Sequence, residues 1–307
     1  SWVEIILPFS DHLKLRNDIM LSDQKTIRYG KLFEILDSLA ADVAMRHAGG
    51  REASTGQYTM TIVTAAVDTM HIYRDIDVLS DVVLRGYIGH VGSSSMEVCI
   101  DILNTSEEVL GQTMFIMVAR DPATGKAVQV PKLDMDSADG KNRYLHGELR
   151  AKARKQKRAS SLSKNAPMSS EIELIHSLYL QSVQLKKQKD AIMKTPLSAN
   201  DKDNVYLMYP QDRNLHGNIF GGHILRRAFE AARVTASIFF GTEDKISFQA
   251  VDEIQFVKPV PVGSIVEFTS RVTYSEMTAC VVNVMASTVD VLSGVKDVTN
   301  SFNYMFS

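Results

Sequence analysis

The chain of 307 residues has a formal net charge of −2, with 45% apolar and 23% charged residues. This composition is typical of a globular protein long enough for two domains, and the small net charge gives no general attraction to nucleic acid or to an anionic membrane. No apolar run approaches the roughly 20 residues that a membrane-spanning helix needs. Cys99 and Cys280 sit in apolar runs, suggest neither a disulfide framework nor a metal site, and are expected to be buried.

The first 140 residues predict one long helix followed by strands. Residues 1–9 indicate a strand or a docking arm, and residues 13–21 a short strand. Residues 27–47 carry apolar side chains at helical spacing and stop at Gly49-Gly50, which predicts a helix. Runs rich in β-branched or alternating apolar residues predict the strands that follow, at residues 58–71, 82–90, 96–103 and 113–118.

The middle of the chain has a different composition. Residues 148–158 (ELRAKARKQKR) form a basic, helix-prone run, residues 159–170 indicate a flexible joint, and residues 171–194 predict another amphipathic helix. The basic run is interpreted either as a solvated helix face or as a contact for anionic lipid or RNA. We therefore expect a domain at 1–140, a helical basic linker at 141–200 and a second domain at 201–307.

The second domain repeats the pattern of the first. Val67-Asp68 matches Val251-Asp252 at a spacing of 184 residues, and the same spacing aligns the strands that follow. One face of each sheet must be covered, and the long helix before the strands is the element available to cover it. The sequence thus predicts an α+β fold in which a long helix is wrapped by an antiparallel sheet, twice over, with the copies paired about a pseudo-two-fold axis. The expected elements of the second copy are a strand at 205–209, a helix at 223–240 and strands at 246–256, 265–274, 278–288 and 299–306.

A glycine-containing loop, residues 216–222 (HGNIFGG), feeds the start of the second long helix. Glycines let backbone N–H groups approach a ligand closely, and a helix start presents unpaired N–H donors at its positive end. Such a place stabilises a negative oxygen. His216 could support the neighbouring Asn218, or it could have no catalytic role.

The two long helices align at a spacing of 192 residues, which places Asp37 on Phe229 and Thr26 on Asn218. Asp37 interrupts an otherwise apolar stripe, so a functional carboxylate is expected there. The alternatives are a solvated aspartate at the helix edge or one paired with a basic group. Asn218 could equally be a turn or cap residue.

The first copy therefore has a carboxylate without the glycine loop, and the second copy has the loop without the carboxylate. If the copies pair, one complete site forms between Asp37 and residues 218–222, and the opposite one, Thr26 with Phe229, lacks the chemistry. Glu230 could be a second acid, but Arg226 and Arg233 lie at helical spacing from it and favour a solvated, ion-paired face.

These motifs resemble the double-hotdog acyl-CoA thioesterases, and most closely a mitochondrial type of that family. The resemblance covers nearly the whole chain. It rests on residues 216–222, on residues 29–32 (YGKL) followed by residues 36–40 (LDSLA), on residues 89–98 (GHVGSSSMEV) and on residues 251–260 (VDEIQFVKPV).

The resemblance implies a tandem hotdog fold that hydrolyses acyl-CoA to free acid and CoA. Asp37 would be the general base or a nucleophile, Asn218 would orient a water, and the N–H groups of Gly221 and Gly222 would stabilise the oxyanion. No Gly-x-Ser-x-Gly elbow is present, which disfavours a serine triad.

Groups that bind the CoA part are expected nearby in the sequence. Arg28, Lys31 and Lys258 could hold its phosphates, and so could the basic run at 150–158, although each could simply be a surface charge. Ser94 and Ser95 could line a CoA channel or form a turn.

The resemblance also implies a homo-oligomer, as a trimer of double hotdogs, or a hetero-assembly, in the mitochondrial matrix. No cofactor or metal is expected beyond CoA as part of the substrate and product, and no nucleic-acid partner. Two further hypotheses remain open: a non-catalytic hotdog subunit of a larger mitochondrial assembly, and a regulatory module that binds acyl-CoA without turnover.

Overall fold

The structure is a computed structural model, and it describes the following residues: 2–21, 23, 25–49, 59–134, 138–160, 165–187, 201–214, 217–242, 246–252 and 254–307. The N-terminal half contains β1 (Trp2–Leu7), α1 (Leu13–Ile19), α2 (Tyr29–Ala48), β2 (Thr61–Ile72), β3 (Val82–Val91), β4 (Ser95–Asn104) and β5 (Val109–Arg120). The connecting helices are α3 (Ala138–Ala159) and α4 (Ser169–Lys187). The C-terminal half contains β6 (Lys202–Leu207), the 3-10 turn η2 (Pro210–Asp212), α5 (Gly221–Phe240), β7 (Phe248–Val251), β8 (Ile254–Gln255), β9 (Ile265–Glu276), β10 (Ala279–Val289) and β11 (Lys296–Phe306).

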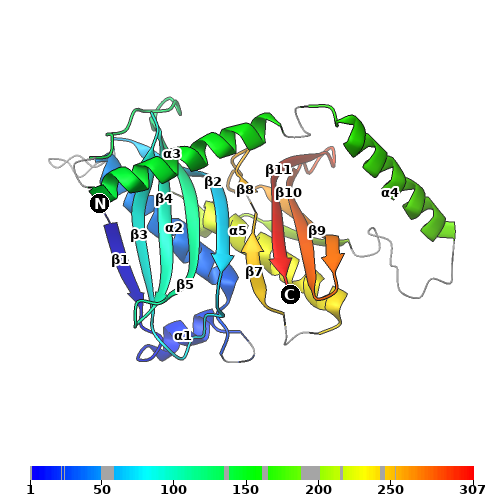
Figure 1. Cartoon of the computed structure of the whole chain (residues 1–307), viewed down its shortest axis with the longest axis horizontal. Coiled ribbons are helices and arrows are strands. Elements are labelled where there is room, and N and C mark those ends of the chain that lie inside the picture. Colours follow the sequence, from blue (N-terminus) through cyan, green and yellow to red (C-terminus); the bar gives the residue numbers. More distant parts are fainter. Residues whose placement is uncertain are drawn as a thin grey trace.

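The described strands form one continuous sheet, and equivalent strands of the two halves follow in the same order from each edge to the centre. Its order is β1-β3-β4-β5-β2-β7-β11-β10-β9-β6, with β8 also pairing with β2 (Figure 1). At the spacing of 184 residues, β2, β3 and β4 correspond to β7–β8, β9 and β10. The two halves therefore meet edge to edge where β2 pairs with β7, as a pseudo-two-fold axis requires.

The two long helices are equivalent residue for residue. α2 and α5 begin and end at positions 192 residues apart, and both are terminated by a left-handed glycine, Gly49 at φ 65° and Gly241 at φ 68°. Glycine adopts this conformation without the steric penalty of a Cβ atom, and the amide of each glycine donates to the last turn of its helix.

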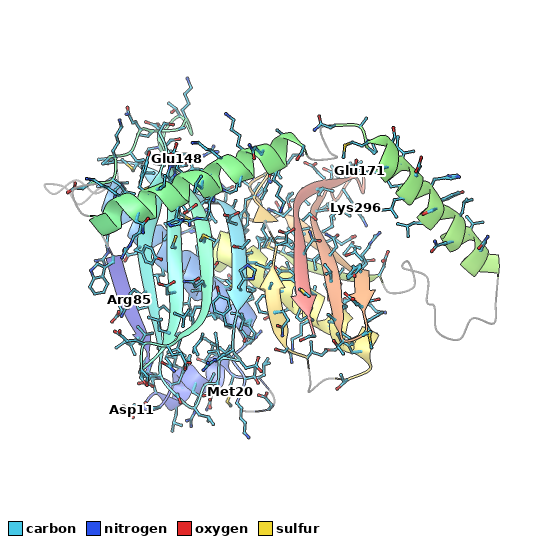
Figure 2. The ribbon with its side chains drawn as sticks, in the orientation of Figure 1. Asp11, Met20, Arg85, Glu148, Glu171 and Lys296 are labelled. Carbon is cyan, nitrogen blue, oxygen red and sulfur yellow. The ribbon has the colours of Figure 1, made fainter. Side chains whose placement is uncertain are left out.

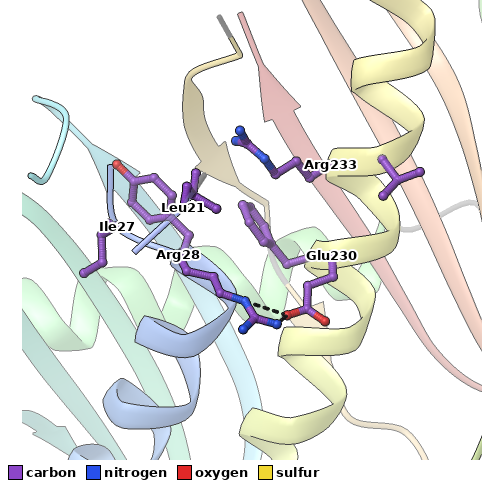
Figure 3. Close-up of a pocket in the computed structure, with 8 residues that line it drawn as sticks. Leu21, Ile27, Arg28, Glu230 and Arg233 are labelled. Atoms are coloured by element: carbon purple, nitrogen blue, oxygen red, sulfur yellow. Dashed lines mark hydrogen bonds and ion pairs between the residues drawn. The ribbon is translucent and has the colours of Figure 1, made fainter. Parts of the chain in front are cut away.

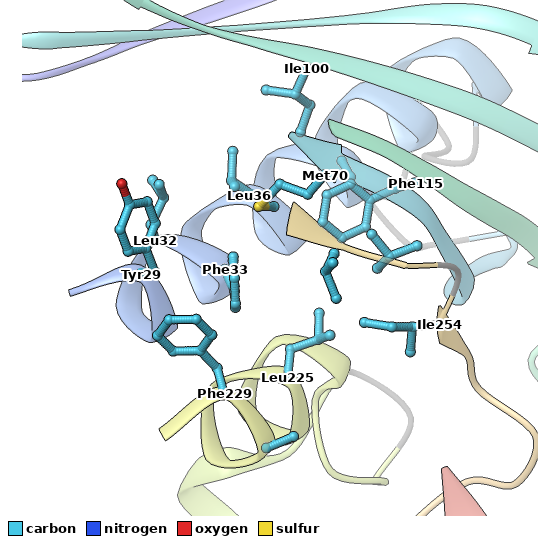
Figure 4. Packing of buried hydrophobic residues seen from close by; sticks show 14 of the residues in the cluster. Tyr29, Leu32, Phe33, Leu36, Met70, Ile100, Phe115, Leu225, Phe229 and Ile254 are labelled. Atoms are coloured by element: carbon cyan, nitrogen blue, oxygen red, sulfur yellow. The ribbon is translucent and has the colours of Figure 1, made fainter. Parts of the chain in front are cut away.

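The core lies where α2 and α5 pack against each other beneath the sheet. Phe33 of α2 and Phe229 of α5 are in edge contact, with ring centroids 5.1 Å apart. Figure 4 shows these rings with Leu36 and Leu225, between the helices and the strand residues Met70, Phe115 and Ile254. Burial of this shared apolar surface fixes the two helices relative to each other.

Most sequence-based expectations for the elements are confirmed, but one is wrong. Residues 13–21 were expected to be a strand, whereas Leu13–Ile19 is the helix α1. The alternation Leu13-Lys14-Leu15-Arg16 imitates a strand pattern, but the His12 ring accepts a hydrogen bond from the Leu15 amide at 3.1 Å and so caps a helix start. The spacing of 192 residues between the two helices exceeds the spacing of 184 between the strands by eight residues. These eight residues fall largely within 50–58, which lie outside the described residues.

The basic helix α3 lies across the outer face of the N-terminal half-sheet (Figure 1). Arg150 donates to the buried Glu97 at 3.0 Å, and Arg154 donates to both Glu97 and Asp68 at 2.7 Å. Lys157, one turn further on, pairs with Asp252, the equivalent of Asp68 in the other half. The prediction of a wholly solvated basic face is therefore wrong for Arg150 and Arg154, which are held by carboxylates. The division at residues 140 and 200 stays a prediction.

Candidate active site

Asp37 is fully buried in α2 and is held by one donor from each half of the molecule. The Thr64 hydroxyl on β2 donates to Asp37 Oδ1 at 2.6 Å, and the Gly222 amide at the start of α5 donates to Oδ2 at 2.6 Å. Among the described residues, no basic side chain pairs with this carboxylate. The predicted functional carboxylate is thus buried as expected, and both alternatives, a solvated or a base-paired aspartate, are wrong.

The two glycines at the start of α5 allow this close approach. A Cβ atom on Gly222 would lie 2.9 Å from the Glu34 Cα and 2.7 Å from a Phe220 ring carbon, and one on Gly221 would lie 3.1 Å from Asp37 Oδ2. Real Cβ atoms essentially never approach a neighbour to less than 3.0 Å. A side chain at residue 222 would therefore push the start of α5 away from α2 and break the bond to Asp37.

The environment of Asp37 raises its pKa. Burial is the largest influence and raises the pKa from 3.8 to about 6, while the hydrogen bonds from Thr64 and Gly222 act in the opposite direction. The positive end of α5 also favours the ionised carboxylate. The result is a group that is largely ionised at neutral pH yet accepts a proton far more readily than a surface aspartate, which is the property of a general base.

Asn218 is positioned by a turn before α5. Its amide donates to Asn214 Oδ1 at 3.2 Å, its carbonyl accepts from the Asn214 amide at 2.7 Å, and Gly217 takes φ 77°. The residue is half-buried, and its side-chain amide has no hydrogen-bond partner among the described residues. Its assignment to the site stays a prediction, and His216 lies outside the described residues.

Charged groups gather on the pseudo-two-fold axis beside the site. Glu34 and Arg226 are equivalent positions of the two helices and form an ion pair with each other at 3.2 Å. His223, next to Gly222, lies 3.2 Å from Asp212, and burial lowers its pKa despite that carboxylate. This network ties the start of α5 to α2 and so helps to hold Gly222 against Asp37.

The equivalent place on the other side of the axis is filled with aromatic rings. Phe229 stands at the position of Asp37, Phe248 at the position of Thr64, and Tyr29 at the position of Gly221. The Phe229 ring lies 5.1 Å from that of Phe248 and 6.1 Å from that of Tyr29. These side chains agree with the prediction that this second place lacks the catalytic groups of the first.

A cavity of about 170 Å³ remains beside those rings (Figure 3). Its rim carries an ion pair in which Arg28 Nε donates to Glu230 at 3.1 Å. Glu230 also accepts from Arg226, so the predicted ion pairing of Glu230 is confirmed, but its side chain is only 25% exposed and the expectation of a solvated face is wrong. Arg28, a candidate for CoA binding, therefore lines the cavity beside Phe229 rather than contacting Asp37.

The other candidates for CoA binding are spread over the molecule. Lys31 pairs with Glu34 at 3.0 Å, and Lys258 pairs with Asp297 at 2.6 Å. Ser94 and Ser95 lie at the tight connection of β3 to β4, where the Ser94 carbonyl accepts from Ala119 and the Ser95 carbonyl from Gly92. The structure brings none of these four residues into hydrogen-bond contact with Asp37, and their roles stay predictions.

Thr64 was missed by the sequence analysis. The signal was available, because the spacing of 184 residues places Thr64 on Phe248, just as the spacing of 192 places Asp37 on Phe229. At the spacing of the strands, a second polar residue of the first copy is thus replaced by a phenylalanine in the second copy.

No group of three or more His, Cys, Asp or Glu side chains within the described ranges is arranged to hold a metal ion. Both cysteines are buried and free, as expected. None of the described helices has an apolar stretch long enough to cross a lipid bilayer.

Solved structures share this architecture over the whole chain. A putative oleoyl thioesterase from Lactobacillus plantarum superposes with a TM-score of 0.61 at 10% identity, covering 100% of this chain and 96% of that one. The 12:0-ACP thioesterase from Umbellularia californica superposes with a TM-score of 0.59 at 10% identity, covering 100% and 97%. At these identities the likeness shows the fold alone, and that fold is a tandem hotdog.

Sequence comparison gives the family. The model of the Thioesterase superfamily matches residues 24–110 and again residues 216–293, once in each half. The mitochondrial acyl-coenzyme A thioesterase 10 of Mus musculus is 31% identical over 317 residues, and the mitochondrial acyl-coenzyme A thioesterase 9 of Homo sapiens is 30% identical over 316. Each alignment covers all of this chain and 71% of the relative. The chain belongs to the thioesterase superfamily and is a thioester hydrolase.

Proposed function

We propose that the protein hydrolyses acyl-CoA thioesters to the free acid and CoA at one composite site between its two hotdogs. The observation that carries this proposal is the buried Asp37 carboxylate, held by Thr64 from its own half and by Gly222 from the other. The names of the relatives at about 30% identity, acyl-coenzyme A thioesterases, support CoA as the carrier of the acyl group.

In the proposed reaction Asp37 takes a proton from a water whose oxygen attacks the thioester carbonyl. The tetrahedral intermediate collapses by breaking the carbon–sulfur bond, and the proton passes from Asp37 to the leaving CoA thiolate. The Asn218 amide would orient the water, which its half-buried position and its amide without a described partner support.

The oxyanion would accept a hydrogen bond from the Gly221 amide at the start of α5. This amide has no hydrogen-bond partner among the described residues. Gly222 was predicted to share this task, but its N–H donates to Asp37 in the structure. We therefore assign Gly222 mainly to positioning the base.

Asp37 could instead attack the carbonyl directly and form an anhydride that water then opens. Single turnover in ¹⁸O-labelled water detects the anhydride route when water opens the anhydride at its aspartyl carbon. Attack by water places ¹⁸O in the product acid, whereas opening of an anhydride at the aspartyl carbon leaves ¹⁸O in the Asp37 side chain.

Lys31, Lys258, Ser94 and Ser95 are proposed to contact the CoA part, with Arg28 holding an anion at the opposite side of the axis. The lysines would exchange their present carboxylate partners for phosphate oxygens. No cofactor is proposed. The names of the relatives support a mitochondrial location, which we propose for this chain as well. The matrix as the compartment, and a homo-oligomer of double hotdogs or a hetero-assembly, are parts of the proposal that rest on the family resemblance alone.

The proposal is tested by measuring free-thiol release from a series of acyl-CoA substrates, with wild-type protein and Asp37→Ala. Turnover by the wild type and its loss in the variant, with acyl-CoA still bound, is the expected result. Binding of acyl-CoA to the wild type without thiol release would contradict hydrolysis and favour a regulatory CoA-binding module. The absence of both acyl-CoA binding and thiol release would favour a non-catalytic subunit.

A further inference from the structure

The absence of a side chain at Gly221 leaves a space beside the proposed oxyanion donor. Apart from the chain neighbours of Gly221, the atoms nearest to the position of a Cβ atom on this residue are Asp37 Oδ2 at 3.1 Å, Phe256 Cζ at 3.5 Å and Phe256 Cε1 at 3.6 Å. The Asp37 carboxylate and the edge of the Phe256 ring therefore border the same space. A thioester whose carbonyl oxygen accepts a hydrogen bond from the Gly221 amide would lie close to both side chains.

Phe256 is held at this place by β8, a strand that links the two halves. β8 belongs to the C-terminal half but pairs with β2, and the Phe256 amide donates to the Ala65 carbonyl on β2 at 3.0 Å. On its other side, the Asn300 side chain of β11 donates to the Gln255 carbonyl at 3.1 Å. Figure 1 shows β8 between β2 and β11, and Lys296, labelled in Figure 2, marks the beginning of β11. The backbone that carries the ring is thus fixed to the strand that also supplies the hydroxyl donor to the buried carboxylate.

The other side of the pseudo-two-fold axis shows that the fold does not require a ring at this position. The equivalent of Phe256 at the spacing of 184 residues is Ile72, and the equivalent of Gly221 is Tyr29. Ile72 and Tyr29 are buried, at 8% and 2% exposed, whereas Phe256 is half-buried. The polar side therefore combines a residue without a side chain with a large ring, and part of that ring is free to contact a substrate.

We propose that Phe256 is a specificity-determining residue, whose ring closes the face of the thioester away from Asp37 and so selects acyl groups that are unbranched at the carbon next to the carbonyl. The inference rests on the proposed hydrolysis of acyl-CoA. The attacking oxygen must approach the carbonyl carbon from one face of the planar thioester, so that face has to stay open. A straight acyl chain can lie in the plane, whereas a methyl group on the carbon next to the carbonyl projects out of it. With one face needed for attack and the other closed by the ring, such a methyl group has no free position.

The test compares two isomeric acyl-CoA substrates that differ only in the position of one methyl group. The near-branched isomer carries the methyl group on the carbon next to the carbonyl, and the far-branched isomer carries it close to the other end of the chain. Their main chain has the length that the wild type hydrolyses fastest. The measured quantity is the ratio of kcat/KM for the two isomers, obtained from thiol release. Because both substrates meet the same enzyme preparation, a loss of folded protein cancels in this ratio.

The wild type is expected to favour the far-branched isomer. Phe256→Ala should raise the relative kcat/KM of the near-branched isomer by about tenfold or more, since room for one methylene in an apolar site changes kcat/KM by about 10–200-fold. Phe256→Leu is the milder change, because it keeps an apolar side chain against the core, and it should give a smaller rise. Val257→Ala is the matched control. The Val257 side chain is 69% exposed, so this substitution should leave the ratio unchanged.

The failure of this inference can be distinguished from the failure of the proposed function. If the wild type releases thiol from straight-chain acyl-CoA and neither Phe256 variant changes the ratio, this inference is overturned and the proposed function stands. A rise in Val257→Ala as large as that in Phe256→Ala would likewise overturn it. If the wild type releases thiol from none of the acyl-CoA substrates, the proposed function is contradicted, and this inference with it.

Discussion

The two places related by the pseudo-two-fold axis have the same backbone and opposite chemistry. On one side Asp37, Thr64 and Gly221 form a buried polar site, and on the other side Phe229, Phe248 and Tyr29 fill the same positions with rings. Each aromatic pair contributes about 0.5–1.5 kcal/mol beyond its burial, whereas a buried carboxylate costs stability. In the proposed division of roles, the polar side carries out catalysis and the aromatic side stabilises the interface between the two halves.

The largest effects are expected for substitutions of Asp37 and Phe229, the equivalent residues at the centres of the two sides. Asp37→Asn should lower kcat for acyl-CoA by about 1,000-fold, because it removes the base from an otherwise intact site. Phe229→Leu should leave kcat within a few-fold of the wild type and lower the free energy of unfolding by roughly 1–3 kcal/mol, because Phe229 packs against five other rings. Steady-state kinetics and denaturant unfolding measure the two effects. A large loss of kcat in Phe229→Leu at full folding would contradict the division of roles.

The paired glycines give a sharper comparison. Gly222→Ala should destabilise the fold by about 2–3 kcal/mol and lower kcat by at least tenfold, because its Cβ would press on the Glu34 backbone. Gly30→Ala, at the equivalent position, should have a much smaller effect, because the shortest contact of its Cβ would be 3.2 Å, to Arg226 Cγ, compared with 2.7 Å and 2.9 Å at Gly222. Equal effects of the two substitutions on kcat would show that Gly222 has no special role.

Asn218 and Thr26 form the next pair. Asn218→Ala should lower kcat by about 10–100-fold with little change in KM, because it removes the group that orients the water. Thr26→Ala is the matched control, since the Thr26 hydroxyl bonds only locally to Asp23, and kcat should be unchanged. A wild-type kcat for Asn218→Ala would show that Asn218 is only a turn residue.

The smallest effect is expected for the CoA contacts. Lys258→Ala should raise KM for acyl-CoA about three- to tenfold, because one charge-assisted contact to phosphate is lost. The KM for an acyl-pantetheine substrate, which lacks the nucleotide, should not change. An equal rise in KM for both substrates would show that Lys258 does not contact the phosphates.

The sequence predicted that Asp37 of the first copy meets the glycine loop of the second, because the repeat supplies its own comparison. Aligning the two helices exposed Asp37 against Phe229 without any structure. Thr64 was not found because a threonine in a Thr- and Val-rich strand looks ordinary until its contact across 27 residues is seen. The α1 helix was mistaken for a strand because its cap, His12, acts through a side-chain bond that periodicity does not show. The roles of Arg150 and Arg154 depend on Glu97, a distant partner that only the fold brings near.

The pH dependence of kcat/KM tests the central claim most directly, because it reports the ionisation of the base in the free enzyme. Since burial raises the pKa of Asp37 to about 6, activity should be full above that value and fall as the pH drops through it. Thr64→Val removes a hydrogen bond that favours the ionised carboxylate, so the midpoint should move to higher pH, and Thr64→Ser should restore it. A midpoint near 4, or one that Thr64→Val leaves unmoved, would contradict a buried Asp37 as the base.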